Sequence, residues 1–132
     1  MDAGRMNNML TMEERTMVRD LILLPYIDTM ASNSMREMEL SRNILAKAYL
    51  MAGKYIQKRI MQDTYRLRQA LKKQNIKVEE DTNDDFILYY MIYYRGYQER
   101  FGMTRDVMRT EISLRLTQYT SDYGNVLKDY LK

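Results

Sequence analysis

Carboxylates are the side chains in this sequence best suited to catalysis or metal binding. The chain has no His and no Cys, so it lacks the commonest general base, thiolate nucleophiles and the usual ligands of transition metals. Five acidic residues fall within segment 79–85, and oxygen ligands of this kind suit a divalent cation. We interpret this group as a solvated turn, because acidic and amide side chains are common in turns.

Two short motifs have part of the spacing of known binding loops. Segment 81–85 begins like a calcium-binding EF-hand loop, but Phe86 replaces the required Gly and Ile92 the bidentate Glu. Gly53-Lys54 is similar to the end of a phosphate-binding loop, but Tyr55 follows instead of Ser or Thr. The sequence therefore predicts no catalytic residue, metal site or cofactor, no small-molecule substrate, and a protein that is not an enzyme.

Basic residues are concentrated in segment 54–77, where the only acidic residue is Asp63 and the local net charge is +7. Arg59, Arg66 and Lys73 recur every seven residues, so they lie on one face of a helix. A basic face with interleaved Tyr can neutralise phosphates and stack bases; the alternative is a solvated face matched by acidic residues elsewhere in the molecule or in a dimer. The candidate face for nucleic acid or an acidic partner comprises Lys58, Arg59, Arg66, Lys72 and Lys73.

Segment 44–52 is apolar apart from Lys47. A helix that is apolar on almost every side is central in a core or lies in a subunit interface, and the 13 Met residues of the chain suit adaptable surfaces. We therefore expect a non-enzymatic interaction or regulatory protein that forms a homo-oligomer or binds another protein, with nucleic-acid binding as the alternative. The candidate interface residues are Ile44, Ala48, Leu50, Met51, Tyr55, Tyr90 and Tyr94.

Helix signals divide the first part of the chain into several pieces. Thr11 and Glu14 form a capping box and predict a helix over 12–24, which Pro25 ends or kinks. A short helical piece over 26–30 and a polar linker over 31–34 follow.

The longest helix is expected over about 35–74. Ser34 and Glu37 form a second capping box at its start, Gly53 is a point where it could kink or split, and Asn75 is suited to the position just after its end. A last helix is expected to begin after Thr104 and to stop at Gly124.

Segment 76–94 fits two interpretations. A β-hairpin is favoured by apolar and polar residues that alternate at 76–80, by a polar turn, and by an aromatic run over 86–94. A helix over 84–101 is the alternative. In a strand, Tyr90 and Tyr94 would share one face, and Tyr89, Tyr93 and Tyr97 the other.

These elements predict one mainly α domain over residues 11–132, after a frayed segment 1–10. The expected fold is a helical hairpin or bundle around helix 35–74 with a small β-hairpin at 76–94; an all-α four-helix bundle is the alternative. The chain has 132 residues, a formal net charge of +3, and no apolar run near the ~20 residues of a membrane span. We expect a cytoplasmic protein.

The order of motifs in the second half of the chain carries a resemblance. The basic helix is followed by Ile-Lys-Val at 76–78, Tyr-Arg-Gly-Tyr at 94–97 and Met-Arg-Thr-Glu-Ile at 108–112. This order resembles that of small uncharacterised helical proteins of low-GC Gram-positive bacteria and their mobile elements. The resemblance implies no particular activity.

Overall fold

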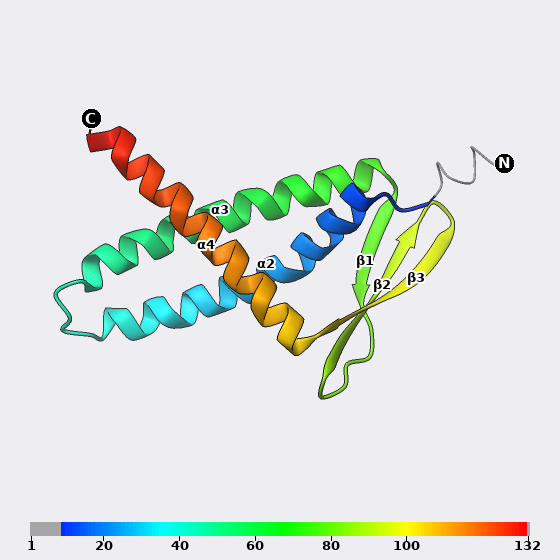
Figure 1. The fold of residues 1–132 in the computed structure, drawn as a ribbon, viewed down its shortest axis with the longest axis horizontal. Helices are drawn as coiled ribbons and strands as arrows, with labels where there is room; N and C mark the ends of the chain where they lie inside the picture. The colour runs from blue at the N-terminus through cyan, green and yellow to red at the C-terminus, as the bar shows by residue number, and fades with distance from the viewer. Residues whose placement is uncertain (1–8, 132) are drawn as a thin grey trace.

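The structure is a computed structural model that describes residues 9–131, with side chains up to residue 129. Helices α2 and α3 form an antiparallel hairpin, a small sheet lies at one end of it, and α4 crosses both helices (Figure 1). The expected mainly α fold with a β-hairpin is thus confirmed, and the four-helix alternative is wrong. The elements are α2 (Met12–Glu39), α3 (Ala46–Lys73), β1 (Ile76–Glu80), β2 (Ile87–Tyr94), β3 (Tyr97–Thr104) and α4 (Arg105–Leu131).

Helix α2 begins at the predicted capping box but continues well beyond Pro25. The Thr11 hydroxyl accepts a hydrogen bond from the backbone N–H of Glu14, whose carboxylate accepts one from the N–H of Thr11, both at 3.0 Å. Pro25 is inside the helix, between Leu23 and Ile27, which are both fully buried. Burial on either side of the proline outweighs the ~3 kcal/mol that it removes from a helix interior.

Segment 31–34 is helical and is not the predicted linker. Its small residues lie against α3: the Ser32 hydroxyl accepts a hydrogen bond of 2.7 Å from the Gln57 amide. One turn later, the Met35 side chain covers Gly53, where an added Cβ would lie 2.7 Å from the Met35 Cγ. The Ser and Ala residues therefore permit close packing of two helices, and the predicted helix start after Ser34 is wrong.

The chain reverses at residues 40–45, within the predicted single helix 35–74. The Ser41 hydroxyl accepts a hydrogen bond of 3.0 Å from the backbone N–H of Asn43, and the Asn43 side chain accepts one of 2.8 Å from the N–H of Leu45. These local bonds make a turn where the apolar pattern continues. Helix α3 is continuous through Gly53 and ends as predicted, with Asn75 at a φ of 57° just after its C-cap.

The sheet has the strand order β1-β2-β3, with antiparallel pairs in which Ile76 is opposite Tyr94 and Leu88 is opposite Met103. The predicted hairpin 76–94 is confirmed, whereas β3 was missed because charged residues and Gly102 interrupt its pattern. Strands β2 and β3 are joined by Arg95 and Gly96 at φ values of 48° and 88°, the positive values that a two-residue turn needs.

The tight β2–β3 turn also changes which tyrosines share a face. Tyr97 is opposite Tyr94 in the register, and their rings stack with centroids 5.7 Å apart. Tyr97 therefore lies on the face of Tyr90 and Tyr94. Its predicted place beside Tyr89 and Tyr93 is wrong, because counting along one continuous strand ignores the turn.

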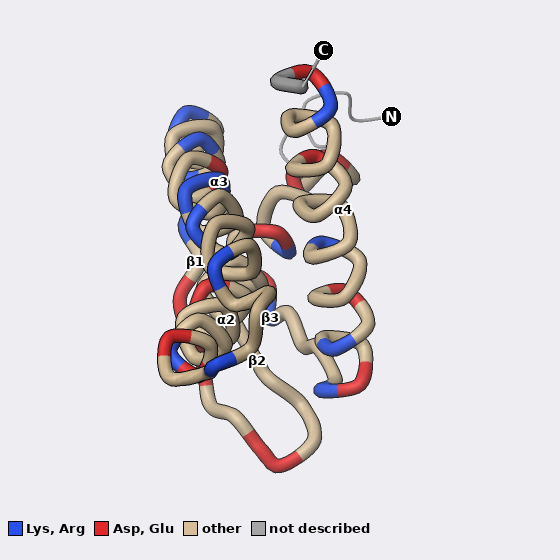
Figure 2. The backbone as a smooth tube through the Cα atoms, turned by 90° about the vertical axis from the view of Figure 1, so that its left-hand side faces the viewer, with Lys and Arg blue, Asp and Glu red and all other residues tan. Residues whose placement is uncertain are grey.

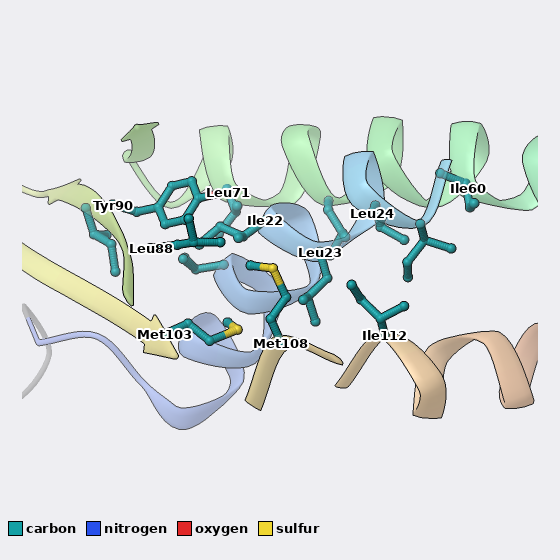
Figure 3. Packing of buried hydrophobic residues seen from close by; sticks show 14 of the residues in the cluster. Ile22, Leu23, Leu24, Ile60, Leu71, Leu88, Tyr90, Met103, Met108 and Ile112 are labelled. Atoms are coloured by element: carbon teal, nitrogen blue, oxygen red, sulfur yellow. The ribbon is translucent and has the colours of Figure 1, made fainter. Parts of the chain in front are cut away.

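The core draws side chains from every element (Figure 3). Leu23 of α2 lies between Leu71 of α3 and Ile112 of α4, and the inner face of the sheet closes one end with Leu88 and Tyr90. Removing these side chains from water is the main force that holds the hairpin, sheet and α4 together.

Helix α4 begins at the predicted cap, since the Thr104 hydroxyl accepts the backbone N–H of Val107 at 3.2 Å. It continues through Gly124 to Leu131, so the predicted stop at Gly124 is wrong. An added Cβ at Gly124 would touch nothing within 4 Å, and this glycine therefore carries no packing requirement. Among residues 9–131, no helix combines the length and apolar character that crossing a bilayer needs.

Candidate interaction surfaces

The turn between α2 and α3 presents an apolar surface to solvent. Leu40 is 86% exposed, Ile44 is 94% exposed, and Met51 is 55% exposed. These residues lie at the end of the hairpin remote from the sheet (Figure 1), where the turn leaves them no neighbour to pack against. We define the apolar tip as Leu40, Ile44, Leu45, Tyr49 and Met51.

The exposure of the apolar tip excludes one of the two interpretations of segment 44–52. The segment is not the centre of a core within one chain, because Ile44, Ala48 and Met51 are exposed and Leu50 is half-buried. Three tip residues were missed, and the turn-forming Ser41 and Asn43 are the signal that could have placed them at an exposed end. The missed residues are Leu40, Leu45 and Tyr49.

The other candidate interface residues lie away from the tip or inside the molecule. Tyr55 is half-buried against Tyr123 of α4, with ring centroids 5.0 Å apart. Tyr90 is buried, and its hydroxyl shares a hydrogen bond of 3.0 Å with that of Tyr26; burial and this bond raise the pKa of the Tyr90 hydroxyl. Tyr94 is half-buried in the sheet. Tyr90 is therefore a core residue of this chain.

The predicted basic face divides between two sides of α3. Arg59 faces α4, where its guanidinium lies 3.5 Å from the Asp122 carboxylate and donates to the Tyr55 hydroxyl at 3.0 Å. Arg66 lies 3.3 Å from the Asp63 carboxylate. Their seven-residue spacing does place them on one face, but that face is oriented towards α4. Four members of the predicted set are exposed: Lys58, Arg66, Lys72 and Lys73.

A different row of residues, four lysines with Tyr65 among them, occupies the solvent side of α3. Its members are separated by seven, four, seven and seven residues, so they lie along one line of the helix, and all are exposed. No ion pair links any of these lysines to an acidic side chain in the part of the chain that the structure describes. Figure 2 shows blue segments down α3 with little red among them. We define the lysine face as Lys47, Lys54, Lys58, Tyr65 and Lys72.

Asp20 of α2, Asp63 of α3 and Asp122 of α4 form polar contacts where these helices meet. The Tyr119 hydroxyl donates a hydrogen bond of 2.6 Å to the Asp63 carboxylate, while Arg115 of α4 pairs with Asp20 of α2. Burial and the Asp63 carboxylate raise the pKa of the Tyr119 hydroxyl. This polar network fixes α4 across the hairpin and engages Arg59, whereas Arg66 is exposed and pairs with Asp63 of its own helix.

A second polar centre joins the start of α2 to the sheet. The Arg95 guanidinium donates to both oxygens of the Glu14 carboxylate, at 3.1 and 3.2 Å, and to the backbone carbonyl of Met9 at 2.8 Å. It also donates to the carbonyl of Gln74 at 3.1 Å. One side chain therefore links the start of α2, the end of α3 and the β2–β3 turn.

The acidic turn between β1 and β2 is held by its own hydrogen bonds. Asp84 accepts the backbone N–H groups of Phe86 and Ile87, both at 2.7 Å, which lowers the pKa of its carboxyl. Asp81 lies 3.1 Å from the Arg100 guanidinium. Within residues 9–131, no group of three or more acidic side chains is placed to hold a metal ion.

A protein-family model named for the YhjD protein matches residues 9–123. The chain belongs to the YhjD protein family. The match includes the whole hairpin, the sheet and α4 as far as Tyr123, so both the apolar tip and the lysine face lie within the YhjD region. No curated protein and no solved structure matched the chain significantly. The function of this YhjD family member is therefore inferred from its surfaces.

Proposed function

We propose that this protein is a non-enzymatic interaction or regulatory protein that self-associates through the apolar tip. The observation that carries the proposal is the exposure of Ile44 and Leu40 at the end of the hairpin, 94% and 86%. Leu40, Ile44 and Leu45 are all exposed at this one turn, and groups of exposed apolar residues mark interaction sites on folded proteins. The proposed place of action is the cytoplasm of a bacterium, in line with the resemblance of the sequence.

A second copy of the chain fits the charges around the tip. Glu37 and Glu39 end α2, while Arg42 lies just beyond, and all three are exposed. None of them has an ion-pair partner among the described residues. A twofold axis through the tip would bring the acidic end of one copy near Arg42 of the other, as a self-complementary interface requires.

The oligomeric state tests this proposal. We expect wild-type protein to have a mass that is a multiple of 15.9 kDa by light scattering at high protein concentration. Ile44→Glu should give a folded monomer, because a carboxylate in an apolar interface is left without a partner. Leu114→Glu changes another exposed apolar residue on α4 and should leave the oligomer intact.

Three results would overturn the proposal of self-association. They are a monomeric wild-type protein, an Ile44→Glu variant that still associates, and a Leu114→Glu variant that dissociates equally. If Ile44→Glu unfolds, Met51→Asp gives a second test at the same tip, with circular dichroism to confirm helix content. Loss of structure in both variants would mean that the tip belongs to the fold of a single chain.

A further inference from the structure

The lysine face has no role in the packing of the molecule. Helix α3 contacts α2 through Gly53, Ile60 and Leu67, which are buried on its opposite side. Its contacts with α4 pass through Arg59 and Tyr55. Other residues of α3 therefore hold the helix in place, and the lysines take no part in these contacts.

Positive charge on this face is not compensated by neighbours. Helix α3 contains eight basic residues and one acidic residue, Asp63, and Asp63 is turned towards α4, where it accepts from Tyr119. Figure 2 shows the acidic segments mainly on α4, at the sheet and on the α2 side, away from the outer side of α3. Such segregation produces a local positive field that attracts a polyanion.

The dimensions of the lysine face match a duplex. Lys47 and Lys72 are about 38 Å apart along the axis, at 1.5 Å per residue, which is close to the 34–36 Å of one turn of double-stranded DNA. Lysine is a point charge that binds phosphate without a fixed geometry. Exposed Gln62 and Gln69 lie beside the row and add hydrogen-bond donors for phosphate or sugar oxygens.

We propose that the lysine face of α3 binds the phosphate backbone of double-stranded DNA. A single-stranded nucleic acid is less suitable, because such binders stack successive bases on several aromatic rings, and Tyr65 is the only aromatic member of this face. An anionic membrane is also less suitable. Helices that lie on a membrane bury a continuous apolar side, and the corresponding side of α3 is used against α2.

The test is binding of a fluorescently labelled 30-base-pair DNA duplex to the full chain, measured by anisotropy over a series of salt concentrations. Four phosphate contacts predict that log K falls against log salt with a slope of about −3.6. The double variant Lys54→Gln and Lys58→Gln removes two contacts, so it should bind more weakly with a slope shallower by about 1.8.

A matched control removes the same charge elsewhere. Lys77→Gln with Lys128→Gln changes one exposed lysine in β1 and one near the end of α4, and it should keep the wild-type slope. Lys54 and Lys58 lie outside the apolar tip, so this test does not depend on self-association. An unchanged oligomeric state of the test variant confirms that the two surfaces are measured separately.

The proposal is overturned by any of four outcomes. The first is no duplex binding at about 50 mM salt, where phosphate contacts are strongly favoured. The second is an equal loss of duplex affinity in the test and control variants. The others are tighter binding of single-stranded DNA or duplex RNA, and binding only to vesicles that contain anionic lipid.

Discussion

Arg95 combines a strained backbone position with a bidentate ion pair. The residue has a φ of 48°, which non-glycine residues seldom adopt, and its guanidinium holds Glu14 and two backbone carbonyls. Arg95→Ala leaves the carboxylate of Glu14 buried without this partner. We expect the free energy of unfolding to fall by about 3 kcal/mol in urea denaturation.

Two comparison variants show whether the bidentate geometry matters. Arg95→Lys keeps the charge but offers no fork of donors, so it should recover only part of the loss. Arg109→Ala breaks an exposed pair with Asp106 and should change stability by less than about 0.5 kcal/mol. Similar losses at positions 95 and 109 would contradict the assigned role of Arg95.

Glu14 should make stability depend on acid pH. Burial opposes its ionisation, but hydrogen bonds from Arg95 and from the backbone of Thr11 outweigh this and hold the pKa below the ordinary value of 4.5. A carboxyl with a lowered pKa contributes stability above its unfolded pKa and loses it as pH falls through the folded pKa. Thermal unfolding of wild type and Glu14→Gln should therefore differ at pH 7, and the two should converge below pH 4.5. A difference in unfolding temperature between the two proteins that stays constant to low pH would contradict the role of the Glu14 carboxylate.

At the scale of elements, two helical glycines should respond in opposite directions to substitution. At Gly53 an added Cβ would lie 2.7 Å from the Met35 Cγ, so Gly53→Leu should lower stability by about 1–3 kcal/mol through overpacking. At Gly124 nothing lies within 4 Å, so Gly124→Ala should stabilise α4 by up to about 1 kcal/mol. Circular dichroism during denaturation measures both effects, and a neutral Gly53→Leu would mean that α2 and α3 are not tightly packed there.

The same elements show what local sequence signals could and could not predict. Thr11, Thr104 and Asn75 were assigned correctly, because caps depend on hydrogen bonds within a few residues. Segment 31–34 was misassigned and Pro25 does not end the helix, because the helical state of both depends on packing against distant residues. The turn at 40–45 was missed because apolar residues recur on both sides of Ser41 and Asn43, at Leu40, Ile44 and Leu45, and their pattern alone favours a continuous helix.

At the scale of the whole molecule, the candidate interaction surfaces were only partly predictable. The sequence indicated that segment 44–52 was unusually apolar and that segment 54–77 was a basic face, either binding a partner or solvated. Which basic residues face solvent depends on where α4 crosses the hairpin, and that crossing is set by Tyr119 and Arg115 in the last part of the chain. Composition could therefore identify the segments, but not the orientation of Arg59 and Arg66.

The ion pair between Glu14 and Arg95 also has a consequence for synthesis on the ribosome. The two residues are separated by 81 positions, whereas α2 and α3 are consecutive and joined by a short turn. The helical hairpin can form as soon as α3 has emerged. The ion pair at the start of α2 can form only after Arg95 leaves the exit tunnel. At about 5–20 residues per second, the interval from Lys73 to Arg95 lasts about 1–4 s. During that time, and until β3 and α4 have also emerged, Leu23 and Leu71 lack their cover from the sheet and α4, so the nascent chain is open to chaperones.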